Sequence, residues 1–579
     1  MDLASQAATA SGRRPIDEWH SRPKSAINTE RPSLAFYIDY NRKEHTFPPP
    51  SHNRKVSMEK SEEFESPNPL DDLRNARRAV NEEHEQTVRE AVKSYYKAIF
   101  WSLYLSTAVI MEGYDTSLVF SFFGLPTFAK KYGTPQQDGL YSLSAPWQSA
   151  LGQGAMVGQF FGLIITGYAT DLYGFRRTAA AACILNAAFV FILFFAPNIE
   201  TLLTGQILLG LPLGSFLTLT TVYTAEISPL ALRPYLETWV NICWSIGKLM
   251  ASGVLRSYSE DTTEWAYRVP WAVQWIFPPF ILLGVVLAPE SPWWLIRQQR
   301  IEDARKSLLR LSSGLTDEKV SNTLSQMILT NMQERELQAS TSYLDCFRGT
   351  NLRRTEISCV AQTMQPLVGF ALVLWTTSFF QTQGLTANDA FNLSLGQNAV
   401  GLVAGILLWF IMPRVGRRTI YLCGLGAIFV LQITIGALGV PTYTKATAWS
   451  TGALIMGFCL CYSLSVGPMS YIISVEVPST RLRNKTAVLG RNIYHIGSVF
   501  NSTLTTYMIS PAGWGWQGKT AFFWAAFTML AWVWTFFRLP EIKDRTFVEL
   551  DVLFENDVPA RAFTSTQPQV FTAENPEDE

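Results

Sequence analysis

Two carboxylates, Glu112 and Asp115, lie within an otherwise apolar stretch of the chain. They are three positions apart, so in a helix they share one face. A carboxylate withdrawn from water holds a proton more readily, and its protonation then follows which side of a barrier is open. The pair therefore predicts a proton-coupling site, with Asp115 ahead of Glu112. The alternative is a carboxylate fixed in a structural ion pair.

Three further ionisable residues lie in long apolar segments, where a charge is costly and requires a role. Lys248 could bind an anionic substrate group, pair with Glu112 or Asp115, or extend to the membrane surface; the carboxylate partner is favoured. Arg491 is a candidate counter-ion for a carboxylate. His495 could relay protons, although a hydrogen-bonding role in packing is the commoner use of such a residue.

The segments that carry these residues have the length of membrane spans. A bilayer core requires about 20 apolar residues per helix, which excludes strands of a barrel. The sequence predicts an all-α membrane protein with twelve spans: 99–122, 147–170, 178–196, 201–224, 236–256, 269–288, 357–380, 391–412, 419–438, 449–473, 486–509 and 520–538.

The spans form two copies of one unit. Pro289-Glu290 and Pro540-Glu541 follow long apolar runs 251 positions apart. Two basic loops, ending in Arg176-Arg177 and Arg417-Arg418, and two stretches from Glu to Arg, 226–233 and 476–483, repeat in the same order. Duplicated halves of this kind build secondary transporters, with the substrate site between the halves.

The repeated charges are predicted to act as gates rather than as substrate sites. Ion pairs between the basic loops and the acidic residues would hold one side of the transporter closed. The predicted gating residues are Arg176, Arg177, Glu226, Arg233, Arg417, Arg418, Glu476 and Arg483, with Glu290 and Glu541 as further partners.

The spans divide the chain into five parts. These are an N-terminal tail (1–97), a first six-helix half (98–288), a helical linker (289–356), a second half (357–538) and a C-terminal tail (539–579). The linker predicts helices over 294–311 and 316–337, and the N-terminal tail a helix over 70–97, while 1–69 and 556–579 have a composition typical of disorder. Lys and Arg are more frequent in the loops on the linker side, which predicts cytoplasmic termini.

Composition excludes several other classes of protein. Only 16% of the residues are charged, against about 25% in a soluble globular protein. The net charge is zero, so nothing indicates a nucleic-acid partner. The seven Cys have no metal-ligand spacing, and a P-loop pattern at 513–520 contains two Trp and joins two predicted spans, so we expect no metal, nucleotide or other cofactor.

Several stretches resemble the sugar porters of the major facilitator superfamily, and within them the fungal α-glucoside (maltose permease) group. They include Met111-Glu-Gly-Tyr-Asp115, Pro289-Glu-Ser-Pro-Trp-Trp-Leu-Ile-Arg297, Thr480-Arg-Leu-Arg-Asn-Lys-Thr486 and Trp514-Gly-Trp-Gln-Gly-Lys519. The resemblance covers roughly residues 98–562 and is more specific for the family than for a substrate.

The resemblance implies a sugar site made of amides and an aromatic ring. It assigns sugar-hydroxyl contacts to Asn241 and Gln365, with Gln362 as a partial replacement for missing amides, and an aromatic contact to Tyr471. It also supports Asp115 as the proton carrier. This chain departs from the family at Lys248, where relatives have Gln, and at Pro366 and Phe370, where relatives have amides. Pro366 is predicted to break its helix.

These features together predict a proton-coupled transporter, not an enzyme, for the uptake of a sugar, most simply an α-glucoside. The expected partners are a small-molecule substrate, protons and the lipid bilayer, and the expected location is the plasma membrane. Lys248, Pro366 and Phe370 leave a non-sugar metabolite as the alternative substrate. A transport-inactive nutrient sensor is a third reading, against which the short C-terminal tail argues.

Overall fold

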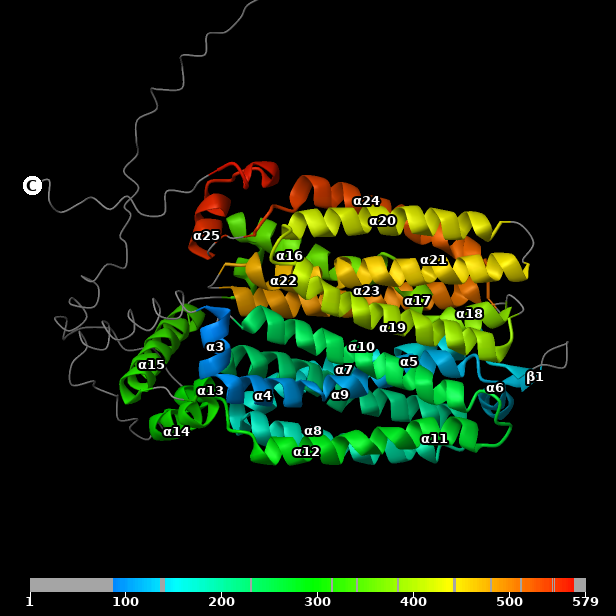
Figure 1. Ribbon diagram of the computed structural model, residues 1–579, viewed down its shortest axis with the longest axis horizontal. Coiled ribbons are helices and arrows are strands. Elements are labelled where there is room, and N and C mark those ends of the chain that lie inside the picture. Colours follow the sequence, from blue (N-terminus) through cyan, green and yellow to red (C-terminus); the bar gives the residue numbers. More distant parts are fainter. Residues whose placement is uncertain are drawn as a thin grey trace, which may run out of the picture. The chain divides into compact units, whose positions relative to one another are not determined.

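The computed structural model describes residues 87–566, except 136–140, 230–231, 314–315, 340–341, 383–384, 441–443, 480–481, 511–512, 544 and 546. Within these residues the protein is a bundle of long helices with one two-stranded ribbon, β1 (Thr134–Pro135) and β2 (Tyr141–Ser142) (Figure 1). The predicted all-α membrane architecture is confirmed.

The first half runs from α3 to α12. Its helical elements are α3 (Val88–Ser94), α4 (Tyr96–Ser106), α5 (Val109–Phe122), α6 (Pro126–Tyr132), α7 (Ala145–Tyr173), α8 (Phe175–Phe194), α9 (Ile199–Ile227), α10 (Arg233–Ser257), α11 (Trp265–Val273), η1 (Gln274–Ile276) and α12 (Phe277–Leu287).

The second half repeats this plan. Its elements are α16 (Gly349–Leu367), α17 (Ala371–Leu374), α18 (Thr376–Thr382), α19 (Ala387–Ile411), α20 (Arg417–Leu438), α21 (Lys445–Leu464), α22 (Val466–Glu476), α23 (Arg483–Ile509), η3 (Gln517–Lys519) and α24 (Thr520–Arg538), followed by α25 (Phe547–Glu555) and η4 (Ala560–Ala562).

Nine helices or helix pairs in the described part of the chain are long and apolar enough to cross a bilayer. The other three of the twelve predicted spans correspond to α4–α5, α10 and α23. These helices carry Asp115, Lys248 and Arg491, all of them within the bundle. A charged side chain is tolerated in a membrane helix that faces the protein interior, so the residues that weaken the membrane signal also mark the inner faces.

Two spans of the second half are broken, as their prolines predicted. The seventh span stops after Pro366, at Gly369, which has a left-handed φ of 80°. The tenth was predicted to break at Gly467-Pro468, but α21 ends at Leu464 and α22 starts at Val466. Pro468 has no N–H to donate to the carbonyl of Leu464, so the break of the tenth span precedes this proline. Pro468 itself lies in the first turn of α22.

The linker contains three helices, α13 (Pro292–Arg297), α14 (Ile301–Leu311) and α15 (Asp317–Ala339), and the 3₁₀ turn η2 (Tyr343–Phe347). The single helix predicted over 294–311 is wrong, because the chain turns at Gln299, which has a φ of 58°. The helix predicted over 316–337 is confirmed. Trp294, Leu308 and Val320 pack into a separate small core.

Both tails differ from their predicted forms where the structure describes them. Phe563 is fully buried and packs against Phe554 with ring centroids 5.1 Å apart, so residues 556–566 are not disordered. An aromatic side chain this large stabilises the fold of the segment that carries it. The helix predicted over 70–97 is divided at Tyr95, between α3 and α4. Residues 1–86 and 567–579 lie outside the described part of the chain.

A tight crossing between α5 and α10 gives a stability prediction. A Cβ atom at Gly113 would collide with the backbone carbonyl of Trp244, whereas one at Gly167 would meet nothing within 4 Å. We expect Gly113→Ala to lower the free energy of unfolding by about 1–3 kcal/mol, as overpacking does, and Gly167→Ala to leave it unchanged. Thermal unfolding of the two variants in detergent checks this; equal unfolding temperatures would contradict it.

Candidate functional site

A small cavity of about 50 Å³ lies between the two halves at the level of the buried charges. It is lined from the first half by α5, α7, α9 and α10, and from the second half by the broken seventh span, α21 and α23. Polar lining residues include Glu112, Asp115, Gln159, Gln206, Arg491, Tyr494, His495 and Asn501. The lining from both halves is the arrangement that the duplication predicted.

Asp115 is 1% exposed and is held by two amides. Its Oδ1 accepts hydrogen bonds from Gln206 Nε2 at 3.3 Å and from Gln274 Nε2 at 3.2 Å. Gln274 lies in the 3₁₀ turn η1 that interrupts the sixth span. Oδ2 of Asp115 is buried and has no hydrogen-bond partner among the described residues. This oxygen is therefore free to carry a proton.

Glu112 lies one turn before Asp115, and the two acids face the same cavity as their spacing predicted. Its Oε1 accepts a hydrogen bond from Gln159 Nε2 at 3.4 Å. Arg491 lines the same cavity, and its role as a counter-ion for a carboxylate stays a prediction. Arg491 donates to the hydroxyl of Tyr471 at 2.7 Å and lies 4.6 Å from the ring centroid of Tyr494.

His495 follows Arg491 by one turn and also lines the cavity. It is 4% exposed, and neither ring nitrogen has a hydrogen-bond partner among the described residues. A buried polar group without a partner is destabilising by the cost of its lost hydration. His495 is consequently a donor and acceptor that a bound molecule could satisfy, rather than a residue fixed in packing.

Lys248 is buried but does not make the predicted contact with the acids of the first span. Its ammonium lies over the ring of Trp244, 4.2 Å from the centroid, and 5.5 Å from that of Phe370. Cation–π contacts of this kind are strongest where water is excluded. The predicted pairing of Lys248 with Glu112 or Asp115 is therefore wrong, because its ammonium contacts aromatic rings instead.

The rings around Lys248 form an aromatic wall of the cavity, consisting of Trp244, Phe370 and Tyr462. The Phe370 and Tyr462 rings are stacked with centroids 4.4 Å apart, and Trp244 lies 6.2 Å from Phe370. All three residues line the cavity. No local pattern indicates this wall, because single aromatic residues at helical spacing do not reveal which of them converge.

The predicted sugar ligands lie next to the cavity rather than in its lining. Gln365 donates to Gln362 at 2.7 Å, and Gln362 donates to Ser474 at 2.9 Å. Tyr471 is joined to the cavity through Arg491 and is 37% exposed. Asn241 lies on α10, two turns before Lys248. The cavity of this conformation is thus formed by a different set of side chains.

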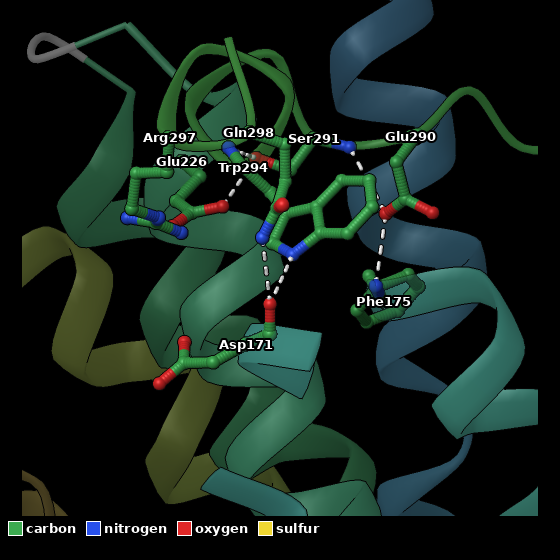
Figure 2. Close-up of polar contacts among 8 residues, drawn as sticks. All are labelled: Asp171, Phe175, Glu226, Glu290, Ser291, Trp294, Arg297 and Gln298. Atoms are coloured by element: carbon green, nitrogen blue, oxygen red, sulfur yellow. Dashed lines mark hydrogen bonds and ion pairs between the residues drawn. The ribbon is translucent and has the colours of Figure 1, made fainter. Parts of the chain in front are cut away.

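At the linker end, the acid of each half has its own arginine partner. Glu226 pairs with Arg297 of α13 at 2.6 Å and accepts from Ser291 (Figure 2). Glu476 pairs with Arg417 at 3.5 Å. The second pair is one that the sequence predicted. In the first half, the predicted pairing of Glu226 with Arg176 or Arg177 is replaced by the linker arginine.

Glu290 serves the start of α8. One carboxylate oxygen accepts from the backbone N–H of Phe175 at 3.0 Å (Figure 2), and the other accepts from the backbone N–H of Arg176 at 3.2 Å. Burial raises the pKa of Glu290 although these donors act in the opposite direction. In the second half, a Cβ atom at Gly416 would collide with the Glu541 carboxylate, just before α20 starts. The two acids thus occupy matching places.

This match corrects the register of the duplicated loops. Helix α8 starts at Phe175 and α20 at Arg417, so Phe175 takes the place of Arg417 and Arg176 that of Arg418. Phe175 therefore stands where the second half has Arg417. Its ring stacks on that of Tyr223 with centroids 4.2 Å apart. The first half consequently has an aromatic pair where the second half has Arg417. Glu226 therefore has no arginine at this place and pairs with Arg297 of the linker instead.

At the opposite end of the bundle, hydrogen bonds join the two halves. Asn398 of α19 donates to Ser252 of α10 at 2.8 Å, and Arg256 donates to Asn392 at 2.7 Å. Farther out, Asn388 donates to Glu260 at 2.8 Å. These contacts hold the two halves together on the side away from the linker.

Comparisons with known proteins agree with this architecture. The model of a family described as "Sugar (and other) transporter" matches residues 101–554. The chain is 39% identical over 502 residues to the general alpha-glucoside permease of Saccharomyces cerevisiae (strain ATCC 204508 / S288c), covering 86% of this chain and 81% of the permease. It is 38% identical over 517 residues to the maltose permease MAL61 of Saccharomyces cerevisiae, covering 88% and 84%.

Solved structures share the fold. A partially occluded, inward-open conformation of the xylose transporter XylE from E. coli has a TM-score of 0.64 and 17% identity, covering 78% of this chain and all of XylE. The proton:xylose symporter XylE bound to 6-bromo-6-deoxy-D-glucose has a TM-score of 0.65 and 17% identity, covering 79% and 99%. The resemblance that the sequence motifs indicated is confirmed.

Proposed function

The chain belongs to the Sugar (and other) transporter family, and we propose that it couples the uptake of an α-glucoside or related sugar to proton entry. The observation that carries the proposal is the unpartnered, buried Oδ2 of Asp115 in a cavity between two half-bundles. The names of the permeases that share more than a third of its residues support the substrate class.

The geometry around Asp115 explains how one proton could be coupled to one substrate. Its Oδ1 accepts hydrogen bonds from two neutral amides. Neutral donors stabilise the carboxylate less than a cation would, so protonation and release remain accessible. Substrate would enter when the carboxyl is neutral, and the halves would then rock to expose the cavity to the other side.

We propose that the sugar lies against the aromatic wall, because an aromatic face packs well on the C–H groups of a pyranose. His495 and Asn501 in the cavity would take hydroxyl contacts. Asn241, Gln362, Gln365 and Tyr471 would join them as the cavity opens, since about 50 Å³ is too little for a disaccharide.

The linker end is proposed to face the cytoplasm, together with both termini, in the plasma membrane. The excess of Lys and Arg in the loops at this end supports that orientation. In this conformation the halves are joined at the opposite end. The described state would then be closed to the outside. A protease site inserted at the exposed Thr316, just before α15, should be cut only from the cytoplasmic side, and cutting from outside would reverse the assignment.

Transport by the purified protein in lipid vesicles tests the proposal. With the outside more acidic, labelled maltose should accumulate inside the vesicles against its concentration gradient. A protonophore, which collapses the pH gradient, should abolish this accumulation. Glucose and a polyol serve as comparison solutes. Accumulation that is indifferent to the pH gradient would refute proton coupling, and no movement of any of these sugars would refute the substrate class.

A non-sugar metabolite is the second candidate, and Phe370 and Pro366 in the cavity lining favour it. Both are apolar residues where the family places amides, so they offer no hydrogen bond to a hydroxyl. Competition by uncharged, acidic and strongly apolar solutes against maltose uptake separates the candidates. The sugar proposal requires maltose and related glycosides to compete best.

Lys248 gives a prediction about the substrate site. Because its ammonium lies on Trp244 and Phe370, Lys248→Gln should loosen the wall and raise the KM for the sugar about tenfold, given the strength of a desolvated cation–π contact. The pH profile of uptake should stay unchanged, and Lys248→Arg should restore most of the affinity. A shifted pH profile with an unchanged KM would instead show that Lys248 acts on the carboxylates.

A further inference from the structure

A basic cleft lies at the linker end of the first half, separate from the central cavity. It holds about 630 Å³ of free volume and opens to the surroundings between the start of α8, the end of α12 and the linker helix α14 (these helices lie together in Figure 1). Arg176, Arg177, Arg300, Lys306 and Arg310 line it. Figure 2 shows part of its inner wall, where Glu290 meets the start of α8.

The carboxylates of the cleft are already occupied. Asp303 accepts two hydrogen bonds from Arg300, at 2.7 and 3.0 Å, and its other oxygen lies 3.6 Å from Lys306. Glu290 accepts from three backbone N–H groups, those of Phe175, Arg176 and Ser291. Five cations thus face two carboxylates, so the cleft has a positive charge excess.

Two of the arginines are held by carbonyl groups rather than by acids. Arg310 donates to the carbonyl of Leu287 at 2.8 Å, and Arg176 donates through Nε to that of Val285 at 3.0 Å. A carbonyl orients a guanidinium without neutralising its charge. The remaining N–H groups of these forks are suited to the oxygens of a phosphate group, which arginine binds in a planar, two-point geometry.

Tyr173 and Val286 line the cleft at the ends of α7 and α12, and the apolar, exposed ends of these two helices are called its rim. Tyr168, Leu172 and Tyr173 at the end of α7 are 74%, 69% and 58% exposed, and Val286 and Leu287 at the end of α12 are 57% and 52% exposed. Both helices are membrane spans. Tyrosines with aliphatic neighbours at the end of a span are typical of the interface between acyl chains and headgroups. The cleft therefore opens where lipid headgroups lie.

The second half provides an internal comparison. Phe536 and Phe537 match Val285 and Val286 by the repeat of 251 positions, and Arg418 donates to the Phe536 carbonyl at 2.8 Å, as Arg176 does to Val285. In the second half, however, Arg561 of the C-terminal segment covers Phe536 and Phe537. Its guanidinium lies 4.2 Å from the ring centroid of Phe536 and 4.7 Å from that of Phe537. The matching place in the first half is the open basic cleft.

From these observations we propose that the basic cleft binds the phosphorylated headgroup of an anionic membrane lipid, with its acyl chains along the exposed rim of α7 and α12. The headgroup phosphates would contact Arg177, Lys306 and Arg310, which approach from the bundle and from the linker. Basic pockets between membrane helices on the cytoplasmic side bind lipids of this class. The bound lipid would tie the linker helix α14 to the first half.

The full chain, purified in detergent and offered phosphatidylinositol 4-phosphate or phosphatidylcholine, tests the proposal by native mass spectrometry. The phosphorylated lipid should be retained in preference. Combined Arg177→Gln, Lys306→Gln and Arg310→Gln should lower its retention by at least about tenfold. Arg305→Gln is the matched control, because Arg305 lies on the same helix but pairs with Asp317 outside the cleft; it should retain the lipid. Equal retention of both lipids, or equal loss in the control, would overturn the proposal.

Two further arms distinguish the source of the phosphate and guard against misfolding. Soluble inositol 1,4-bisphosphate should compete only weakly, since it lacks the acyl chains; competition as strong as the lipid's would show a site for a free phosphoester instead. In the wild-type chain, a photoactivatable form of the lipid should label residues 168–177 and 286–310. Labelling confined to other segments would overturn the assignment, whatever the stability of the triple variant.

Discussion

Asp115→Asn is expected to abolish uphill accumulation of the sugar while leaving exchange between the two sides of the membrane. The reason is that Asn keeps the size of the side chain and its contacts with Gln206 and Gln274, but it cannot exchange a proton. Exchange requires only alternating access, whereas accumulation requires the free energy of the proton, about 1.4 kcal/mol or tenfold in concentration per pH unit. The variant should therefore reach no more than equal concentrations.

Vesicle uptake with an imposed pH gradient measures uphill accumulation, and counterflow of labelled sugar measures exchange. Asp261→Asn is the control, because Asp261 is a partly exposed acid that accepts from the backbone of Thr263 in a loop; its accumulation should equal that of the wild type. Full accumulation by Asp115→Asn would remove Asp115 from the proton path and leave Glu112 or His495 as the carrier.

A disulfide between Ser252→Cys and Ser394→Cys is expected to stop transport completely and reversibly. The two hydroxyl oxygens are 3.4 Å apart, across the contact between α10 and α19. Sulfurs on the same two positions could close to the roughly 2 Å of a disulfide with small adjustments. The bond would hold the halves together at the end opposite the linker, and alternating access requires that end to open. A reductant should restore transport.

A disulfide within one half provides the comparison for this experiment. Ser102 and Thr224 both lie in the first half with their oxygens 3.0 Å apart, so Ser102→Cys with Thr224→Cys should be oxidised without loss of transport. Cys423 is the exposed one among the free cysteines of the described chain and should first be replaced by Ser. Undiminished transport by protein that is fully cross-linked between positions 252 and 394 would contradict alternating access between these halves.

The class of the protein, the twelve spans, the duplication and the two buried acids were all predictable from the order of the amino acids. These features are local, because the length of an apolar run and the spacing of charges along one helix need no knowledge of neighbouring helices. The breaks of the seventh and tenth spans were predictable for the same reason. Pro366 removes a backbone donor within α16, and Pro468 removes the donor that would continue α21 past Leu464.

The tertiary structure alone decided which side chains meet. Phe175 and Arg417 take matching places because each begins a helix beside an acid from a distant loop. Comparison of the two sequences alone matched Arg176-Arg177 with Arg417-Arg418, which is one residue away from this register. Glu226 has Arg297 as its partner because the linker turns at Gln299 and places α13 beside α9.

Lys248 shows the same limit most clearly. The spacing along α10 placed it inside the bundle, but its contacts depend on how α10, the broken seventh span and α21 are rotated against one another. That rotation brings Trp244, Phe370 and Tyr462 together beside the ammonium of Lys248. The acids of α5 accept hydrogen bonds from other side chains, as Asp115 does from Gln206. Helix rotation is set by packing summed over many weak contacts between distant segments, which no local pattern records.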